Sequence, residues 1–190
     1  MSSGRYIDLM ALTSETMEIE DIETSLNYIL RFTGHHKDRE PLSVAQHSLL
    51  CLTMAELFEP DDYELHLAVF THDFAEAYIG DVASPVKKAI GDRWYSFATP
   101  IEEAAEIAFY GSPMDPEMHD RVKTYDLAAL DIERRVMWSS QYGKDKWPAC
   151  PMNVGTIEDK TSLFDAVCGN YVEVKDIWKG LYKEVLGDVE

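Results

Sequence analysis

The stretch Tyr63-Glu-Leu-His-Leu-Ala-Val-Phe-Thr-His-Asp-Phe-Ala-Glu-Ala-Tyr78 decides the fold of this chain. It follows the break at Pro60-Asp61-Asp62, has apolar residues on nearly every side of a helix, and reaches a natural end at Gly80. A helix that is apolar all round is packed on several of its sides. Residues 63–78 therefore predict a central helix around which the rest of the chain folds.

The sequence on either side predicts further helices and no strand. Apolar residues recur at helical spacing in four more segments, which are residues 43–58 with Ser43 as the N-cap, residues 101–110, residues 116–141, and residues 157–186 as one or two closing helices. No segment shows the strict alternation that is typical of a half-buried strand. The fold class that we expect is all-α.

Residues 81–100 interrupt this helical pattern. Turn signals stand at Ser84-Pro85 and Gly91-Asp92, so we expect a loop region near the functional site, with a short helical stretch at residues 86–90. No repeat, low-complexity tract or linker divides the chain, and 190 residues suffice for one sizeable core. Residues 1–190 are therefore expected to form a single compact helical bundle.

The charge balance limits which partners the protein can bind. The 17 Lys and Arg residues face 35 Asp and Glu residues, which gives a formal net charge of −18. Binding to a nucleic-acid polymer depends on neutralising many phosphates with basic groups, so this composition argues against it. A small phosphorylated ligand remains compatible, because it needs only a few local cations and a metal.

Three cysteines and the absence of long apolar runs indicate the compartment. Cys51, Cys150 and Cys168 form no CxxC pair and leave one thiol over, which favours a reduced intracellular protein. The first residues lack the apolar core of a signal peptide, and no run is long enough to span a membrane. We therefore expect a cytoplasmic protein with no membrane partner.

Four side chains from separate helices form a candidate metal site. On the predicted central helix, His72, Asp73 and Glu76 share roughly one face. His47 lies within the apolar stripe of residues 43–58, and Asp126 lies within the apolar stripe of residues 116–141, where an inward carboxylate needs a partner. Together, His47, His72, Asp73 and Asp126 predict a site for one divalent transition metal.

Two imidazoles and two carboxylates suit zinc, cobalt, manganese, iron or nickel and leave coordination positions open for water and substrate. Each residue alone also has a plainer interpretation: His47 as a satisfied core histidine, Asp126 as the partner of a buried Arg or Lys, and His72-Asp73 as a chance dipeptide. The occurrence of all of them on inward helix faces, with Glu76 in phase, favours the metal site.

The remaining polar and aromatic candidates are expected to have structural roles. Asp131 falls on the opposite side of its helix from Asp126 and is expected to be a solvated charge. Surface or loop positions are expected for His35, His36, His66 and His119, and core or interface positions for Trp94, Trp138, Trp147 and Trp178.

This pattern of a His, then His-Asp, then a distant Asp resembles the HD-domain superfamily of metal-dependent phosphohydrolases, over residues 31–126. Within it, the chain looks most like the 5'-deoxynucleotidases and the small phage deoxynucleotide hydrolases, which include dATP triphosphohydrolases. The resemblance implies that the metal ligands are His47 in Val-Ala-Gln-His-Ser, His72, Asp73, and Asp126 in Val-Lys-Thr-Tyr-Asp.

The resemblance also implies roles around the metal. Glu76 matches the family's general acid/base, Asp81 a carboxylate beside the sugar and the scissile phosphate, and Arg31 a phosphate-binding arginine. Lys87, which follows Ser84-Pro85-Val86, matches a segment over the substrate, and Lys88 is a weaker candidate beside it. Lys123, one turn before Asp126, is a further candidate for contact with the phosphates.

Two positions depart from the family pattern. A Trp usually follows the arginine and rejects ribose, whereas this chain has Phe32, which is smaller and still aromatic. The residue before the first His is usually Glu, whereas this chain has Gln46, which can alter the orientation of the ligand but not its identity. Phe32 is therefore a candidate substrate-binding residue. Whether it makes the site prefer deoxyribose over ribose is not decided by the sequence.

The activity implied by the resemblance is hydrolysis of a small-molecule deoxynucleotide, to deoxynucleoside plus phosphate from a dNMP or with release of triphosphate from a dNTP such as dATP. One alternative is hydrolysis of another phosphorylated small molecule, such as an alarmone or a cyclic nucleotide. Another is a metal-binding interaction module without turnover. Because the family is commonly oligomeric, we expect a homo-oligomer.

Overall fold

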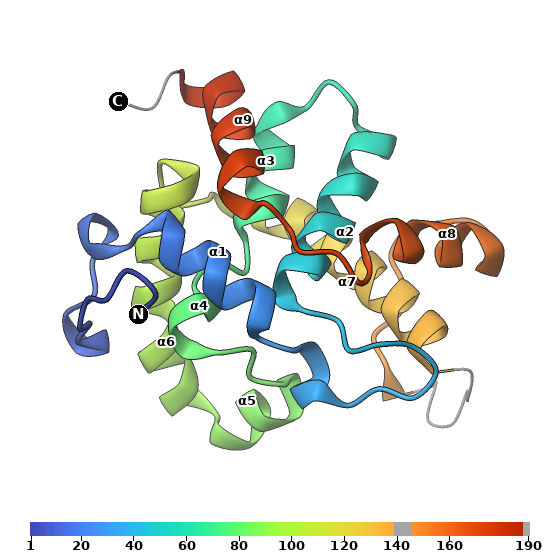
Figure 1. Cartoon of the computed structure of the whole chain (residues 1–190), viewed down its shortest axis with the longest axis horizontal. Helices are drawn as coiled ribbons and strands as arrows, with labels where there is room; N and C mark the ends of the chain where they lie inside the picture. The colour runs from blue at the N-terminus through green and yellow to red at the C-terminus, as the bar shows by residue number, and fades with distance from the viewer. Residues whose placement is uncertain (139–145, 188–190) are drawn as a thin grey trace.

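The computed structural model describes residues 1–138 and 146–187, and in these residues every regular element is a helix or a helical turn (Figure 1). The α-helices are α1 (Ile19–Tyr28), α2 (Val44–Phe58), α3 (Tyr63–Thr71), α4 (Glu76–Ile79), α5 (Ser84–Ile90), α6 (Asp92–Ala105), α7 (Pro116–Met137), α8 (Ile157–Val167) and α9 (Val174–Leu186). Short 3-10 turns are Leu9–Ala11, Ser14–Thr16 and Arg31–Gly34, and a π-helical turn spans Glu106–Tyr110. Leu30 and Ser43 form an isolated β-bridge. The prediction of an all-α fold is confirmed.

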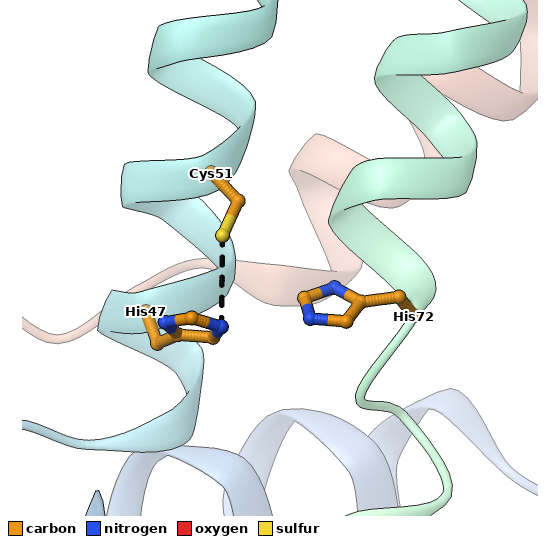
Figure 2. A group of neighbouring side chains, drawn as sticks. All are labelled: His47, Cys51 and His72. Carbon is orange, nitrogen blue, oxygen red and sulfur yellow. Dashed lines mark hydrogen bonds between the residues drawn. The ribbon is translucent and has the colours of Figure 1, made fainter. Parts of the chain in front are cut away.

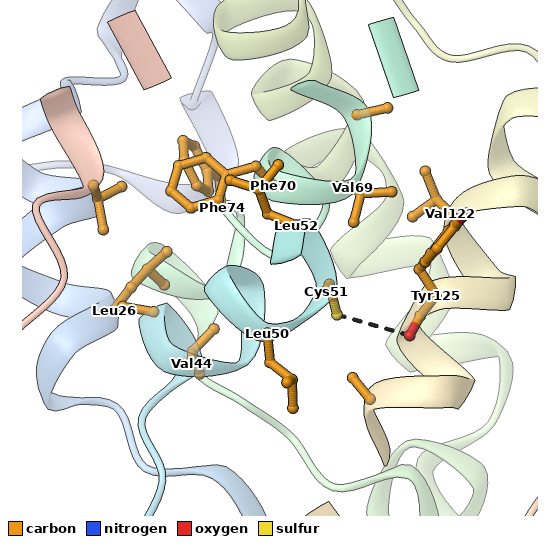
Figure 3. Packing of buried hydrophobic residues seen from close by; sticks show 14 of the residues in the cluster. Leu26, Val44, Leu50, Cys51, Leu52, Val69, Phe70, Phe74, Val122 and Tyr125 are labelled. Carbon is orange, nitrogen blue, oxygen red and sulfur yellow. Dashed lines mark hydrogen bonds between the residues drawn. The ribbon is translucent and has the colours of Figure 1, made fainter. Parts of the chain in front are cut away.

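Helix α3 is the centre of the core, as its apolar sequence predicts. Every residue from Leu65 to Thr71 is buried, including the polar His66 and Thr71. This helix packs against α2, α7 and α9, and Figure 1 shows α9 beside it although the two are far apart in sequence. The side chains between these helices, such as Leu52, Val69 and Phe70, form one continuous apolar cluster (Figure 3). Burial on all sides makes α3 a rigid support for the residues that follow it.

The start of α2 agrees with the prediction. Ser43 Oγ accepts a hydrogen bond from Gln46 N, and Gln46 Oε1 accepts one from Ser43 N, which is a capping box. Gln46 Nε2 also donates to the Asn170 carbonyl. The residue that departs from the family pattern is therefore fixed at the helix start and bonded to the segment between α8 and α9.

The predicted helix over residues 63–78 is not continuous, which corrects the sequence interpretation. Helix α3 ends at Thr71, and α4 begins only at Glu76. The imidazole Nδ1 of His72 lies 2.7 Å from the Val69 carbonyl oxygen, and the turn continues through tighter bonds such as Glu76 N to Asp73 O. His72 and Asp73 therefore lie in the turn between α3 and α4 and not on one continuous helix with Glu76.

Residues 81–100 contain α5 and most of α6 where we expected mainly a loop, and the short helical stretch predicted at residues 86–90 is confirmed as part of α5. The two turn signals are in fact helix starts: Pro85 lies in the first turn of α5, and Gly91, with φ of 68°, separates α5 from α6. Pro at the first positions costs no hydrogen bond, because those amides lack helical partners. Helix α6 continues to Ala105, so the helix predicted over residues 101–110 begins earlier, and Gly111 ends its π-helical turn.

Other elements differ from the expectation at their ends. Helix α7 stops at Met137, and the remainder of the predicted segment up to Gln141 falls largely outside the described residues. The closing segment forms two helices, α8 and α9. Helix α1, which lies across the face of the molecule seen in Figure 1, was not predicted.

Several side chains assigned to the surface or the core can now be placed. His66 is buried, and its Nε2 lies 2.8 Å from the Glu59 carbonyl oxygen, so its predicted surface position is wrong. Trp94 and Trp178 are buried as expected. All three cysteines lie in the described residues and are free thiols. Within these residues, no helix is both long and apolar enough to cross a membrane.

Asp131 is buried, which corrects its predicted role as a solvated charge. Its carboxylate accepts hydrogen bonds from Arg134 at 2.8 Å, from Arg135 at 2.8 and 2.9 Å, and from Lys160 of α8 at 3.0 Å. Burial acts to raise the pKa of Asp131, but these hydrogen bonds outweigh it and lower the pKa below its usual range. The ionised carboxylate thus ties α8 to α7.

Asp131→Asn is expected to lower the free energy of unfolding by about 1–3 kcal/mol at pH 7, because charged donors lose their acceptor. The folded pKa is depressed, so the stabilisation is complete above the ordinary Asp pKa of about 3.9 and is lost as the pH falls through the folded value. In urea denaturation, the free energy of unfolding of Asp131→Asn should therefore fall below that of the unmodified protein by the same amount at pH 7 and pH 5. The difference between the two proteins should become smaller below about pH 4. Asp120→Asn, an exposed change on the same helix, is the control; equal stabilities of the two variants would contradict the assignment.

Candidate metal centre

The four predicted metal ligands lie close together in space. His47 stands in the first turns of α2, His72 and Asp73 directly follow α3, and Asp126 lies midway along α7. His47 Nε2 is 3.5 Å from Asp73 Oδ2 and 3.4 Å from Asp126 Oδ1, and His72 Nε2 is 3.2 Å from Asp73 Oδ2. Residues that are up to 79 positions apart therefore lie close together, since Asp126 and His47 differ by that number in the sequence.

Both imidazoles are oriented by hydrogen bonds on their outer nitrogens. His47 Nδ1 lies 2.6 Å from Glu133 Oε1, and His72 Nδ1 lies 2.7 Å from the Val69 carbonyl oxygen. Carboxylate and carbonyl oxygens only accept, so each Nδ1 carries the proton and donates it. The Nε2 atoms then face the carboxylates, and the buried Nε2 of His72 makes no hydrogen bond within the described residues. This is the arrangement by which proteins orient a metal-ligating histidine.

Cys51 is a third group beside the two rings, and the sequence analysis did not select it. Its Sγ lies 3.6 Å from His47 Nε2, and the ligand atoms of His47, Cys51 and His72 all lie within 4.8 Å of one another (Figure 2). This group could hold a metal ion. The available signal was spacing, because Cys51 follows His47 by four residues and so lies on the same face of α2.

The thiol of Cys51 is poorly suited to act as a ligand by itself. Burial raises its pKa, and Sγ contacts the Tyr125 carbonyl oxygen at 3.9 Å (Figure 3). A thiol becomes a metal ligand only as the thiolate; burial disfavours this form here and outweighs the opposite effect of His47.

The two aspartates, by contrast, are held in the ionised form. Burial acts to raise the pKa of Asp73, but His72, His47 and Arg31 outweigh it, and the net pKa lies well below its usual range. Burial likewise opposes ionisation of Asp126, and the hydrogen bond and charge of His47 again lower the pKa strongly. The centre therefore presents two anionic oxygens to the two imidazoles.

Glu76 lies at the start of α4 and is buried, and its Oε2 has no hydrogen-bond partner within the described residues. Burial raises its pKa well above the usual range, and the nearby charges of Asp73 and Asp81 raise it further. Lys87 Nζ of α5 is 3.8 Å from Glu76 Oε1 and lies over the Trp94 ring, 5.6 Å from its centroid. Burial also raises the pKa of Asp81. Glu76 is thus a carboxyl group that binds a proton readily.

Arg31 approaches the centre from the 3-10 turn after α1. Its Nε donates to Glu133 Oε2 at 3.2 Å, and its Nη1 lies 3.6 Å from Asp73 Oδ2. Glu133 is fully buried and was also missed in the sequence. It follows Asp126 by seven residues, two turns along the same face of α7, and this spacing was the available signal.

Phe32 contacts Arg31 and a tryptophan ring, and Lys123 pairs with one of the predicted ligands. Phe32 has a left-handed backbone with φ of 56°, and its ring lies edge-on to Trp138 with centroids 4.9 Å apart. The guanidinium of Arg31 lies 5.5 Å from the centroid of the Phe32 ring. Lys123 is mostly exposed, and its Nζ pairs with Asp126 Oδ2 at 2.5 Å.

Two bacterial proteins are similar to this chain. The chain is 36% identical over 110 residues to "Uncharacterized protein RCAP_rcc00048" of Rhodobacter capsulatus, and the matched region covers 57% of this chain and 56% of that protein. It is also 33% identical over 133 residues to "Uncharacterized protein YfdR" of Escherichia coli (strain K12), and that matched region covers 70% of this chain and 68% of YfdR. The chain belongs to the YfdR family. No family model matches it.

The similarity covers only part of each relative. The chain spans 56% of the length of the Rhodobacter relative. The name of neither relative states an activity. The possible chemistry of this YfdR-family chain is therefore argued from its own residues.

Proposed function

We propose that this protein is a metal-dependent phosphohydrolase of deoxynucleotides whose single divalent transition metal is held by His47, His72, Asp73 and Asp126. One observation carries the proposal: two imidazoles whose Nδ1 atoms are engaged outward direct their Nε2 atoms at two ionised carboxylates. The buried Nε2 of His72 fits this role, because it makes no hydrogen bond within the described residues and a buried polar atom left in that state is costly.

The choice of Asp73 and Asp126 over Cys51 follows from protonation. Ligands must be deprotonated, and the two aspartates are ionised while burial keeps the thiol protonated. The set of two imidazoles and two carboxylates suits zinc, cobalt, manganese, iron or nickel. When bound, such a metal supplies Lewis acidity, which lowers the pKa of water and polarises a phosphoryl oxygen.

The surrounding residues are assigned by charge and position. Arg31 keeps Nε on Glu133 and directs Nη1 toward Asp73, so its guanidinium can neutralise a phosphate beside the centre. Glu76, whose Oε2 is unpartnered, takes the proton of the attacking water. We assign Asp81 to contact with the sugar and the scissile phosphate, and Lys87 and Lys123 to contact with a longer phosphate chain.

The substrate is proposed to be a dNMP or a dNTP such as dATP, in a cytoplasmic homo-oligomer. Phe32 beside Arg31 would contact the sugar and disfavour ribose. A metal-binding module without turnover is the second candidate, and the His47, Cys51 and His72 group favours it. Glu76 argues against this module, because a purely structural metal site has no need of a buried carboxyl group without a partner.

Substrate profiling is expected to separate these functions. The protein loaded in turn with zinc, cobalt and manganese should hydrolyse at least one deoxynucleotide, with a lower rate for the matching ribonucleotide. Chromatography that resolves phosphate from triphosphate identifies the bond that is cleaved. A protein that binds one metal per chain and hydrolyses none of the nucleotides would support the module; preference for an alarmone or a cyclic nucleotide would support the other hydrolase.

A further inference from the structure

The carboxylate of Glu133 bridges the two halves of the candidate site. Its Oε1 lies 2.6 Å from His47 Nδ1, and its Oε2 accepts the hydrogen bond from Arg31 Nε at 3.2 Å. Both partners also reach Asp73, with His47 Nε2 at 3.5 Å and Arg31 Nη1 at 3.6 Å from Oδ2. These four side chains come from four segments and close a ring.

The ring is buried, so its geometry is restrained on all sides. Glu133 and His47 are fully buried, and the side chain of Arg31 is 11% exposed. Each oxygen of Glu133 faces one donor, which a carboxylate satisfies and an amide cannot, because Gln has a single acceptor oxygen. Glu133 therefore sets the orientation of His47 and Arg31 at the same time.

We propose that Glu133 is a positioning residue that couples the binding of a divalent cation at His47 to the binding of a phosphate at Arg31. The proposal rests on the proposed function, in that it takes a cation and a phosphate as the ligands of these two residues. With His47 on the cation, Glu133 keeps Oε1 on the His47 Nδ1 and holds Arg31 through Nε, so the two amino groups of the guanidinium are left for the anion. Such coupling is reciprocal, so phosphate also favours the cation.

Glu133→Gln tests the bridge, with zinc and inorganic phosphate as the probes. The amide can accept from only one of the two donors, so we expect zinc affinity to fall about 10–100-fold and phosphate affinity to fall as well. Arg31→Lys removes the contacts of the guanidinium with Glu133 and Asp73 and keeps both the positive charge and the contact between Glu133 and His47, so it should weaken phosphate binding while zinc affinity stays within about threefold of the unmodified protein. Zinc is measured by competition with a chelator, and phosphate by calorimetry on the zinc-loaded protein.

The double variant Arg31→Lys, Glu133→Gln separates positioning from general loosening. If Glu133 acts on phosphate through Arg31, the double variant binds phosphate no more weakly than Arg31→Lys alone, and the two effects are non-additive. In the zinc-loaded protein, the Nδ1 proton of His47 should also be protected from solvent exchange in ¹H–¹⁵N spectra, and this protection should be lost in Glu133→Gln.

Glu133→Gln with normal zinc and phosphate affinities, or additive effects in the double variant, would overturn the proposal. If Glu133→Gln does not fold, Glu133→Asp replaces it; this variant keeps the charge on a shorter side chain and should weaken both ligands by a smaller factor. The proposed function can fail separately, because zinc and phosphate binding are measured without turnover. Hydrolysis by a Glu133→Gln protein with normal affinities would overturn the bridge alone.

Discussion

Asp73→Asn is expected to remove the metal and to reduce kcat/KM by about 10³-fold or more. Asp73 Oδ2 lies 3.2 Å from His72 Nε2, 3.5 Å from His47 Nε2 and 3.6 Å from Arg31 Nη1, so this carboxylate oxygen is close to all three side chains. The amide has nearly the same shape but no charge, which leaves the two imidazoles with one ionised partner. Metal content by mass spectrometry should fall well below one ion per chain.

The matched control for this variant is Asp61→Asn, which makes the same chemical change at an exposed position before α3. The control should keep the metal content and activity of the unmodified protein. Circular dichroism establishes that both variants are folded. An Asp73→Asn protein that is folded, retains a full complement of metal and hydrolyses deoxynucleotides at the normal rate would show that Asp73 is not a ligand.

Glu76→Gln is expected to retain the metal and to lower kcat about 10²–10⁴-fold, which is the usual contribution of a general acid or base. The Glu76 carboxyl group is buried with an unpartnered oxygen, and burial followed by the charges of Asp73 and Asp81 raises its pKa. The variant keeps the size of the side chain and removes its ability to take a proton. Single-turnover rates and metal content measured on one preparation separate chemistry from metal loss.

Glu103→Gln on α6 is the matched control for Glu76, because it alters an exposed carboxylate by the same exchange. Loss of the metal from Glu76→Gln would instead make Glu76 a ligand. Undiminished turnover in the folded, metal-loaded variant would remove Glu76 from the reaction.

Helical periodicity accounts for most of what the sequence predicted. It indicated the all-α fold and the central position of α3, because seven consecutive buried residues require an apolar helix surface on every side. It also placed His47 and Asp126 on inward faces, since side chains three and four residues apart share a face. The ligand roles of these residues stay predictions, whereas their convergence with His72 and Asp73 is a feature of the structure.

Local signals were weaker at the ends of helices. The His72 ring bonds to the Val69 carbonyl, and the helix predicted through Tyr78 stops at Thr71. Proline and glycine between residues 84 and 91 indicated a loop, although proline in a first turn is compatible with a helix start.

The amino-acid pattern alone was sufficient for the all-α class, for most of α2, α3 and α7, and for the polar residues within their apolar stripes, because these depend on neighbours within about one helical turn. Only the folded chain revealed that Glu133 joins His47 to Arg31, that Cys51 lies beside both imidazoles, and that Asp131 is buried under Lys160. These contacts link separate helices, and their geometry depends on how the helices pack, which no local spacing encodes.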